Sequence, residues 1–443
     1  MIDVGSFQAR LCEGVDRRAF LKAGLLAPLG LTANPASLAL AAESRKVRSV
    51  VILWLWGAPS HVDTFDPKPN APAEFRGPFS TIPTRTPGVR FTELLPRLAA
   101  RSDRFTLIRS NRNFHSGHTE AGTIALTGAL DGAAGIQPNF GSIVAKGRPA
   151  SSLPSFLAVG RGFPRDVVGP VKGYGGGNWG KVHDPFLVQC SDVGEVDIPT
   201  LKLLDGLTPA HLQDRRELLK ELDSHQRKLD QAEIGKWDNT RNKAYALLTS
   251  PEARKALDVT REKESVREAY GQTSFGQSCL LARRLVEAGV SYIQVNWSQY
   301  VESMTPNCDF GWDTHIYNFE MLPDRHCPIL DRVLSAFLDD LNQRGLLEST
   351  LVIAMGEFGR SPRITPQAAR DHWPNVYFSL WAGGGVQPGR VIGESDRLGQ
   401  EPLTEPITPT MVGTTILERT GFDAQARAEM RVLPGGRVIH ELF

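Results

Sequence analysis

The segment VRSVVILWLWG, residues 47–57, decides the fold of this 443-residue chain. From Val50 to Trp56 every residue is β-branched, aliphatic or aromatic. A run that is apolar on both faces is typical of a buried, parallel strand, because a strand with one solvated face alternates with polar residues. The sequence therefore predicts that this segment is a central strand of a sheet.

Further strands and helices alternate along the rest of the chain. Apolar runs predict strands at 105–109, 290–295, 351–355 and 378–382. Helical spacing of apolar residues predicts helices at 91–98, 118–127, 279–289 and 329–344. We therefore expect an α/β fold with a mainly parallel central sheet flanked by helices.

The first 41 residues have the pattern of an export signal. Arg17 and Arg18 precede an apolar stretch at 23–40, and small residues surround a cleavage point after Ala41. Paired arginines before Phe-Leu-Lys resemble the twin-arginine type of signal, so we expect the twin-arginine export machinery to recognise this leader. No later segment approaches about 18 uninterrupted apolar residues, so no stable membrane span is expected. The expected location is the periplasm or cell envelope.

The remaining chain is expected to form a single domain over 42–430, followed by a C-terminal tail at 431–443. Two segments within it differ in composition. Residues 131–200 are rich in glycine and proline and predict a loop-rich excursion. Residues 201–270 carry charges of both signs at helical spacing and predict a helical insertion.

Charge and cysteine content exclude some function classes. The formal net charge of +1 argues against a nucleic-acid-binding protein, which would carry a basic excess. Motifs for haem attachment or iron–sulfur clusters are missing, which disfavours electron transfer. The four cysteines beyond the leader allow three disulfide connectivities, and only closeness in sequence favours Cys308 with Cys327.

Polar residues with metal-binding side chains recur after four of the predicted strands. They lie in GAPSHVDTFDP, RNFHSGHTEAG, GWDTH, MGEFGR and RDHW. Because the carboxyl ends of parallel strands share one sheet edge, these residues are expected to converge there. Each alone fits a loop hydrogen bond or an Asx-turn, and the recurrence favours a site.

Mixed imidazole and carboxylate ligands suit zinc, manganese or iron better than calcium. We therefore expect a divalent metal, zinc or manganese. The expected ligands are Asp63, Asp313, His315, Glu357 and His372.

Longer motifs resemble a known family. They include GAPSHVDTFDPKPNAP, FGQSCLLARRLVEAGVSYIQVNW, GLLESTLVIAMGEFGRSPRI and RDHWPN, and the resemblance runs from about residue 47 to 422. The family is a large group of exported bacterial proteins known as domain of unknown function 1501. It is grouped with the alkaline phosphatase and sulfatase superfamily, which implies a mostly parallel sheet and a two-metal site that hydrolyses esters.

The resemblance also implies roles for individual residues. Asp63 matches the first metal carboxylate of the superfamily. Residues 118–128 resemble the helix that begins at the superfamily nucleophile, which places His118 at that position, Thr119 after it and Ser116 two residues before it. His118 departs from the Ser, Thr or modified Cys of the superfamily.

The second half of the chain carries the other matches. Asp313 and His315 resemble an aspartate and a histidine of one metal site, and His372 resembles the later metal histidine. Glu357 and Phe358 stand where the superfamily has Asp-His, so one imidazole is missing there.

The expected function is an exported metal-dependent hydrolase of phosphate or sulfate esters, acting on a phosphorylated or sulfated small molecule or glycan. Thr119, Ser116 or a metal-bound water would be the nucleophile, and Arg360 or Arg370 would stabilise negative charge. The alternative is a protein that no longer catalyses a reaction and uses the same fold to bind glycans or partner proteins. The departure at His118 favours this alternative.

Overall fold

A nine-stranded sheet runs through the middle of the computed structural model, which describes residues 47–130, 135–148, 153–199, 250–302 and 310–443. Strand β1 (Ser49–Trp54) pairs in parallel with β10 (Tyr292–Asn296) on one side and β11 (Thr350–Met355) on the other. All six residues of β1 are buried. The prediction of a central parallel strand in this segment is confirmed.

The full strand order is β15-β4-β14-β11-β1-β10-β5-β8-β9. The other strands are β4 (Thr106–Asn111), β5 (Phe156–Gly160), β8 (Phe186–Cys190), β9 (Val196–Asp197), β14 (Tyr377–Ala382) and β15 (Arg390–Ile392). Only β14 and β9 run antiparallel to their neighbours. The predicted α/β fold with a mainly parallel sheet is confirmed. Strand β14 is antiparallel because no helix lies between β11 and β14, and a parallel return would need a crossover.

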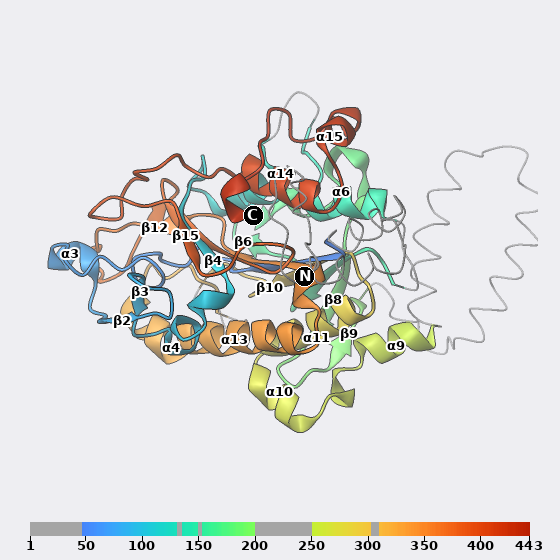
Figure 1. Ribbon diagram of the computed structural model, residues 1–443, viewed down its shortest axis with the longest axis horizontal. Coiled ribbons are helices and arrows are strands. Elements are labelled where there is room, and N and C mark those ends of the chain that lie inside the picture. The colour runs from blue at the N-terminus through green and yellow to red at the C-terminus, as the bar shows by residue number, and fades with distance from the viewer. Residues whose placement is uncertain (1–46, 131–134, 149–152, 200–249, 303–309) are drawn as a thin grey trace, which may run out of the picture. The chain divides into compact units, whose positions relative to one another are not determined.

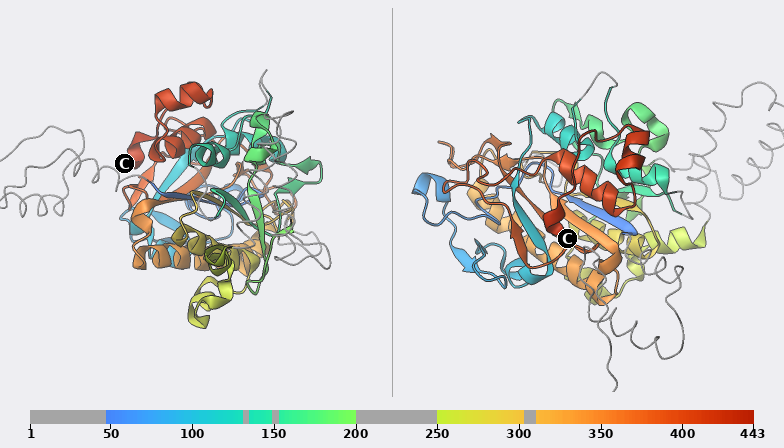
Figure 2. Two further views of the ribbon diagram at one scale, coloured as in Figure 1. Left: turned by 90° about the vertical axis from the view of Figure 1, so that its right-hand side faces the viewer. Right: turned by 45° about the horizontal axis from the view of Figure 1, so that its top comes forward.

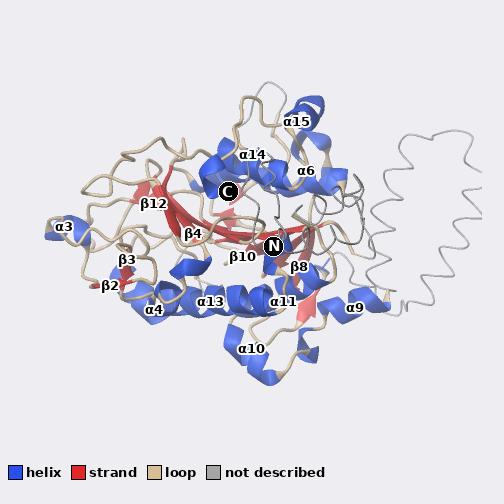
Figure 3. Ribbon diagram, in the orientation of Figure 1, coloured by secondary structure: helices blue, strands red, loops and turns tan. Residues whose placement is uncertain are grey.

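Helices cover both faces of the sheet (Figures 1 and 3). One layer holds α4 (Pro96–Ala99), α9 (Pro251–Leu257), α10 (Glu264–Tyr270), α11 (Ser274–Glu287) and α13 (Cys327–Gln343). The other holds α5 (His118–Thr127), α6 (Phe140–Gly147), α14 (Pro409–Arg419) and α15 (Ala424–Met430). The turned view on the left of Figure 2 also shows the sheet between helices.

The alternation of side chains along β1 explains why this strand is apolar throughout. Val51 and Leu53 belong to the core cluster beneath α11 and α13, whereas Val50, Ile52 and Trp54 belong to the cluster beneath α6 and α14. Each face of the strand therefore meets its own helix layer, and neither face can be polar without burying an unpaired group.

Helix α5 begins at His118 and ends at Thr127, as predicted. Gly128 closes it in the left-handed conformation with φ 85°, and its N–H donates to the carbonyl of Ile124 at 2.7 Å. This closure is the common glycine-terminated helix end. Because α5 follows the carboxyl end of β4, its first turn lies at the carboxyl edge of the sheet.

Three expectations about organisation need correction. The excursion predicted at 131–200 contains sheet strands β5 and β8 and helix α6, which short length and flanking glycines concealed. The tail at 431–443 is packed, since Ile439 and Leu442 are fully buried. The segment 91–98, expected to be helical, is divided between β3 and α4.

Shorter elements complete the described chain. They are α3 (Ala73–Arg76), β2 (Thr81–Pro83), β3 (Arg90–Thr92), β6 (Arg165–Asp166), β7 (Gly169–Pro170), α12 (Asn318–Met321), a π-helical turn (Leu322–His326), β12 (Gly359–Arg360) and β13 (His372–Trp373). None of the helices in the described part of the chain has the length and apolar character that a membrane crossing requires.

Some expectations fall on residues that the structure does not describe. The export leader lies outside the described residues, as does most of the insertion expected at 201–270, from which only α9 and α10 are described. Cys327 is buried, and its expected pairing with Cys308 involves a residue outside the described ranges. Cys190 and Cys279 are also buried.

Candidate metal centre

Three segments bring imidazole and carboxylate groups together at the carboxyl edge of the sheet. His118 is the first residue of α5, and Asp313 and His315 lie in the loop after β10. His372 lies on β13, which pairs with β12 so that His372 is opposite Arg360. Groups far apart in sequence thus meet because their strands end at the same edge.

One oxygen of Asp313 is the centre of this arrangement, which we call the Asp313 cluster (His118, Asp313, His315 and His372). Asp313 Oδ1 lies 3.3 Å from His118 Nε2, 3.0 Å from His315 Nε2 and 3.3 Å from His372 Nε2. The ligand atoms of His118, Asp313 and His372 all lie within 4.8 Å of one another. Three imidazoles and one carboxylate are a common ligand set for zinc.

The other ring nitrogen of each histidine is held by an acceptor outside the cluster. His118 Nδ1 lies 2.6 Å from Glu357 Oε1, His315 Nδ1 lies 3.1 Å from Asp371 Oδ1, and His372 Nδ1 lies 2.7 Å from the carbonyl of Ser116. Carboxylates and carbonyls only accept hydrogen bonds at neutral pH, so each Nδ1 carries the proton. In the neutral tautomer with the proton on Nδ1, each Nε2 offers a lone pair to a metal ion, and this outer support is typical of metal-binding histidines.

The surroundings of these Nε2 atoms favour a bound cation. His315 Nε2 and His372 Nε2 lie 2.8 Å apart, so two unprotonated nitrogens would repel each other there. His118 Nε2 is buried without a hydrogen-bond partner. A proton or a metal ion resolves both, and the donor set fits a divalent transition metal.

The electrostatics of the cluster agree with this fit. Burial lowers the pKa of His372 and keeps its imidazole neutral at pH 7. Burial opposes the charged form of Asp313 as well, but Arg360 and the three histidines hold the pKa of this carboxyl well below its usual range. Burial also lowers the pKa of His118, yet Asp313 and Glu357 outweigh it and raise the pKa to about 9, so His118 is protonated at pH 7 in the metal-free chain and a metal ion would displace that proton. A negative centre surrounded by imidazoles favours a bound cation.

Glycine at position 57 allows the cluster to form. Gly57 has φ 107°, and a Cβ there would lie 2.4 Å from the backbone nitrogen of Trp312 and 2.5 Å from that of Asp313. The loop that carries Asp313 can therefore approach the end of β1 only because residue 57 has no side chain. The N–H of Trp312 donates to the carbonyl of Trp56 at 2.9 Å and fixes this contact.

Arg360 is buried behind Asp313. Its guanidinium donates to Asp313 Oδ1 at 2.5 Å, to the carbonyl of Ala58 at 2.9 Å and to the carbonyl of Gly57. The side chain is 0% exposed, so it does not contact an incoming ester directly. The expected catalytic role of Arg360 is therefore replaced by a role in holding Asp313.

Asp63 lies apart from the cluster. Its two oxygens accept from Arg370, at 2.5 Å from Nε and 2.8 Å from Nη2, and the amide of Asn318 donates to it at 3.3 Å. Both Asp63 and Arg370 are fully buried. The structure places Asp63 in a buried ion pair and outside the group of His118, Asp313 and His372, and the expected roles of Asp63 and Arg370 stay predictions.

Glu357 contacts the cluster from outside. Its Oε1 accepts from His118 Nδ1 and from the N–H of Gly57 at 3.0 Å, whereas Oε2 has no hydrogen-bond partner. Like His315, Glu357 is outside the group of His118, Asp313 and His372, whose ligand atoms lie within 4.8 Å of one another. It therefore orients His118, a role that the sequence could not separate from that of a ligand.

The two candidate hydroxyl nucleophiles differ in their surroundings. Thr119 Oγ1 donates to Glu120 Oε2 at 2.9 Å and lies in the first turn of α5, where backbone N–H groups lack helical partners. Ser116 is exposed, and its backbone carbonyl holds His372. In the described part of the chain, no hydroxyl group is hydrogen-bonded to a side chain of the cluster.

Aromatic rings form the wall of the site. Phe358 lies 4.8 Å from the His118 ring and 4.9 Å from the His372 ring, and Trp56 contacts His118 edge-on at 5.6 Å between ring centres. Trp56 and the Ser116 carbonyl could not be identified as parts of the site from the sequence, whereas Asp371 belongs to the candidate motif RDHW. The position of Asp371 beside His372 was the only available signal.

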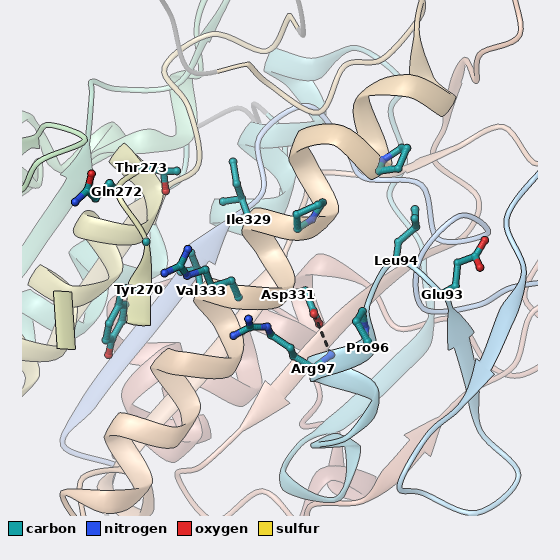
Figure 4. Close-up of a pocket in the computed structure, with 14 residues that line it drawn as sticks. Glu93, Leu94, Pro96, Arg97, Tyr270, Gln272, Thr273, Ile329, Asp331 and Val333 are labelled. Atoms are coloured by element: carbon teal, nitrogen blue, oxygen red, sulfur yellow. Dashed lines mark hydrogen bonds between the residues drawn. The ribbon is translucent and has the colours of Figure 1, made fainter. Parts of the chain in front are cut away.

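A separate cavity of about 770 Å³ opens between α4, α10 and α13. Figure 4 shows its lining residues, among them Asp331, whose carboxylate accepts from the N–H of Arg97 at 2.9 Å. No member of the Asp313 cluster lines this cavity.

Comparison with solved structures gives only distant likenesses. A sulfatase from Pseudoalteromonas sp. is 13% identical over 86% of this chain and 69% of its own, with a TM-score of 0.36. The lipoteichoic acid synthase LtaP from Listeria monocytogenes is 8% identical over 86% of this chain and 74% of its own, with a TM-score of 0.38. A phosphonate monoester hydrolase from Silicibacter pomeroyi is 12% identical over 89% of this chain and 75% of its own, with a TM-score of 0.32.

No curated protein matches the sequence. The family model described as "Protein of unknown function (DUF1501)" matches residues 47–443, which is the whole of the unit that contains the sheet and the Asp313 cluster. The chain therefore belongs to the DUF1501 family.

Proposed function

We propose that this protein is a metal-dependent hydrolase of phosphate or sulfate esters, with the Asp313 cluster as its metal site. The observation that carries the proposal is the convergence of three Nε2 atoms on one oxygen of Asp313, each with its Nδ1 held by an outer acceptor. When bound, zinc or manganese supplies a Lewis acid that polarises the ester.

The proposal assigns one metal ion to the site. His118, Asp313 and His372 would hold it, with His315 as a fourth ligand. Few carboxylates remain that could bind a second ion, because Asp63 is paired with Arg370 and Glu357 Oε1 accepts hydrogen bonds from His118 and Gly57. This differs from the two-metal site that the family resemblance implies.

The chain's own groups would bind and orient the ester. The first turn of α5 lies next to His118, and its N-terminal N–H groups, which lack helical partners, would donate to an anionic ester oxygen. Phe358 and Trp56 exclude water from one side of the cluster. Glu357 and the Ser116 carbonyl keep His118 and His372 in the tautomers that leave Nε2 free.

The test is turnover of an aryl phosphate and an aryl sulfate by purified protein, with zinc or manganese added and with chelator. We expect turnover with metal and its loss in His372→Ala. Thr119→Ala and Ser116→Ala then identify the nucleophile: loss in one names that hydroxyl, and activity in both indicates water. Absence of turnover with every ion overturns the proposal.

The alternative is a binding protein that uses the cluster without catalysis. The lack of a hydroxyl hydrogen-bonded to the cluster in the described residues favours it. Saturable binding of a glycan or partner protein that survives alanine replacement of Asp313 and His372, with no ester turnover, would support this alternative.

We also propose that the chain is exported to the periplasm or cell envelope by the twin-arginine machinery. Arg17 and Arg18 carry this proposal. Replacing both by lysine should retain the uncleaved protein inside the cell, and normal cleavage after Ala41 in that variant would contradict it.

A further inference from the structure

Exposed apolar side chains gather at the edge of the sheet that holds the Asp313 cluster. In the described residues, nine large hydrophobic side chains are exposed, and all but Leu130 lie in loops that follow the carboxyl end of a strand. These eight are Phe114, Phe163, Val167, Val168, Val193, Ile316, Tyr317 and Leu403. Randomly placed side chains would be spread over the whole surface, so their preference for the loops at this edge of the sheet indicates a docking face there.

The most exposed pair forms the tip of a hairpin. Val167 and Val168 join β6 to β7 and are 82% and 75% exposed. The base of this hairpin is connected to the cluster, because Trp56 Nε1 donates to the carbonyl of Arg165 at 3.1 Å while the Trp56 ring contacts His118. The tip therefore projects from the same wall that encloses the cluster.

Two exposed rings lie on other segments that form the cluster. Tyr317, 54% exposed, follows His315 by two residues and has φ 55°, a conformation that a bulky residue adopts at a cost. Phe114, 63% exposed, follows Asn113, whose amide donates to the carbonyl of Glu357 at 2.7 Å. The cluster is thus flanked by apolar side chains from three separate loops.

The chemistry of this rim favours a lipid surface as its occupant. Val167 and Val168, the most exposed of these side chains, are adjacent and aliphatic and suit acyl chains, whereas the face of a sugar ring is recognised by stacked aromatic rings. Exposed Arg165 and Lys172 flank the tip, and Asp166 is the only acidic residue between 163 and 172. An apolar tip with basic flanks and aromatic neighbours is typical of insertion into an anionic membrane interface.

We propose that this edge docks on an anionic lipid surface, with Val167 and Val168 inserted, and so brings the Asp313 cluster to the ester of a lipid headgroup. The second half of this statement rests on the proposed hydrolase function, whereas docking does not.

The test is flotation of the full chain with vesicles of phosphatidylethanolamine, with and without phosphatidylglycerol. We expect wild type to float with the anionic vesicles. The double variant Val167→Asp/Val168→Asp should bind at least about tenfold more weakly, because it places charge where apolar area was buried. Leu130→Asp, an exposed apolar residue outside the rim, is the matched control and should float like wild type.

The outcomes separate docking from catalysis. The double variant should keep wild-type turnover of a soluble aryl ester, and His372→Ala should float normally without turnover. No flotation of wild type, equal flotation of the double variant, or an equal loss in Leu130→Asp overturns the proposal. Retention on a sulfated polysaccharide without vesicle binding points to a glycan instead and also overturns it.

Discussion

Replacing Asp63 by asparagine tests whether this carboxylate stabilises the fold or binds a metal ion. The sequence places Asp63 among the ligands, whereas the structure shows it paired with Arg370 at 2.5 and 2.8 Å and fully buried. Asparagine keeps the size of the side chain but removes its charge and turns an N–H₂ group toward a guanidinium that can only donate. Arg370 would then remain buried without a counter-charge.

The expected cost follows from this geometry. Breaking a buried ion pair by removing one partner costs about 3–5 kcal/mol, because the remaining charge stays out of water. Arg370 keeps hydrogen bonds to the carbonyls of Ser361, Pro362 and Phe75, which places Asp63→Asn at the lower end of that range, about 3 kcal/mol.

The assay combines urea denaturation with metal analysis of the folded protein. We expect a lower denaturation midpoint for Asp63→Asn, with metal content equal to that of wild type. Asp103→Asn is the control, since its ion pair with Arg85 lies at the surface, outside the cluster, and its loss should cost less than about 1 kcal/mol. Loss of metal from Asp63→Asn with unchanged stability would refute the reasoning and restore Asp63 as a ligand.

Three other predictions follow from the same contacts. Glu357→Gln should weaken metal affinity about 10- to 100-fold without unfolding the protein, because the negative charge behind His118 Nδ1 is lost while the amide oxygen can still accept its hydrogen bond; unchanged affinity in a zinc titration would contradict this. Gly57→Ala should lower the free energy of unfolding by about 2 kcal/mol or more and reduce metal content, since its Cβ would collide with the backbone at Trp312; wild-type urea denaturation and metal content would contradict the steric argument. Burial lowers the pKa of His61 and of His326 to about 4, below the value of about 6.5 in the unfolded chain, so the unfolded state takes up protons first as the pH falls. Stability measured by urea denaturation should therefore decrease from pH 6.5 toward pH 4, and a constant midpoint between pH 7 and 5 would refute it.

The sheet could be predicted because its central strands carry their signal locally. Residues 50–56 and 351–355 are apolar runs that are stable only when buried, and α5 has both its start and its glycine end in the sequence. Strands β5 and β8 were missed because five-residue strands among glycines and prolines give too short a pattern. Their pairing with β10 is a long-range property of the sheet.

The cluster could be predicted only as a set of candidates. Strand ends indicated that Asp313, His315 and His372 share an edge, and the structure brings them together with His118. Sequence could not show which carboxylates already have cationic partners, because the ion pair of Asp63 with Arg370 spans 307 residues. Whether a carboxylate can bind a metal ion or instead holds another side chain depends on such contacts between residues that are distant in sequence.

The most direct test of the account is the metal content of the purified chain after reconstitution with zinc and removal of loosely bound ions. Elemental analysis should find one equivalent per chain in wild type and in His440→Ala, an exposed histidine outside the cluster. It should find none in His372→Ala or Asp313→Ala that still unfold cooperatively. A wild-type chain without zinc, two ions per chain, or full zinc in the cluster variants would contradict the account.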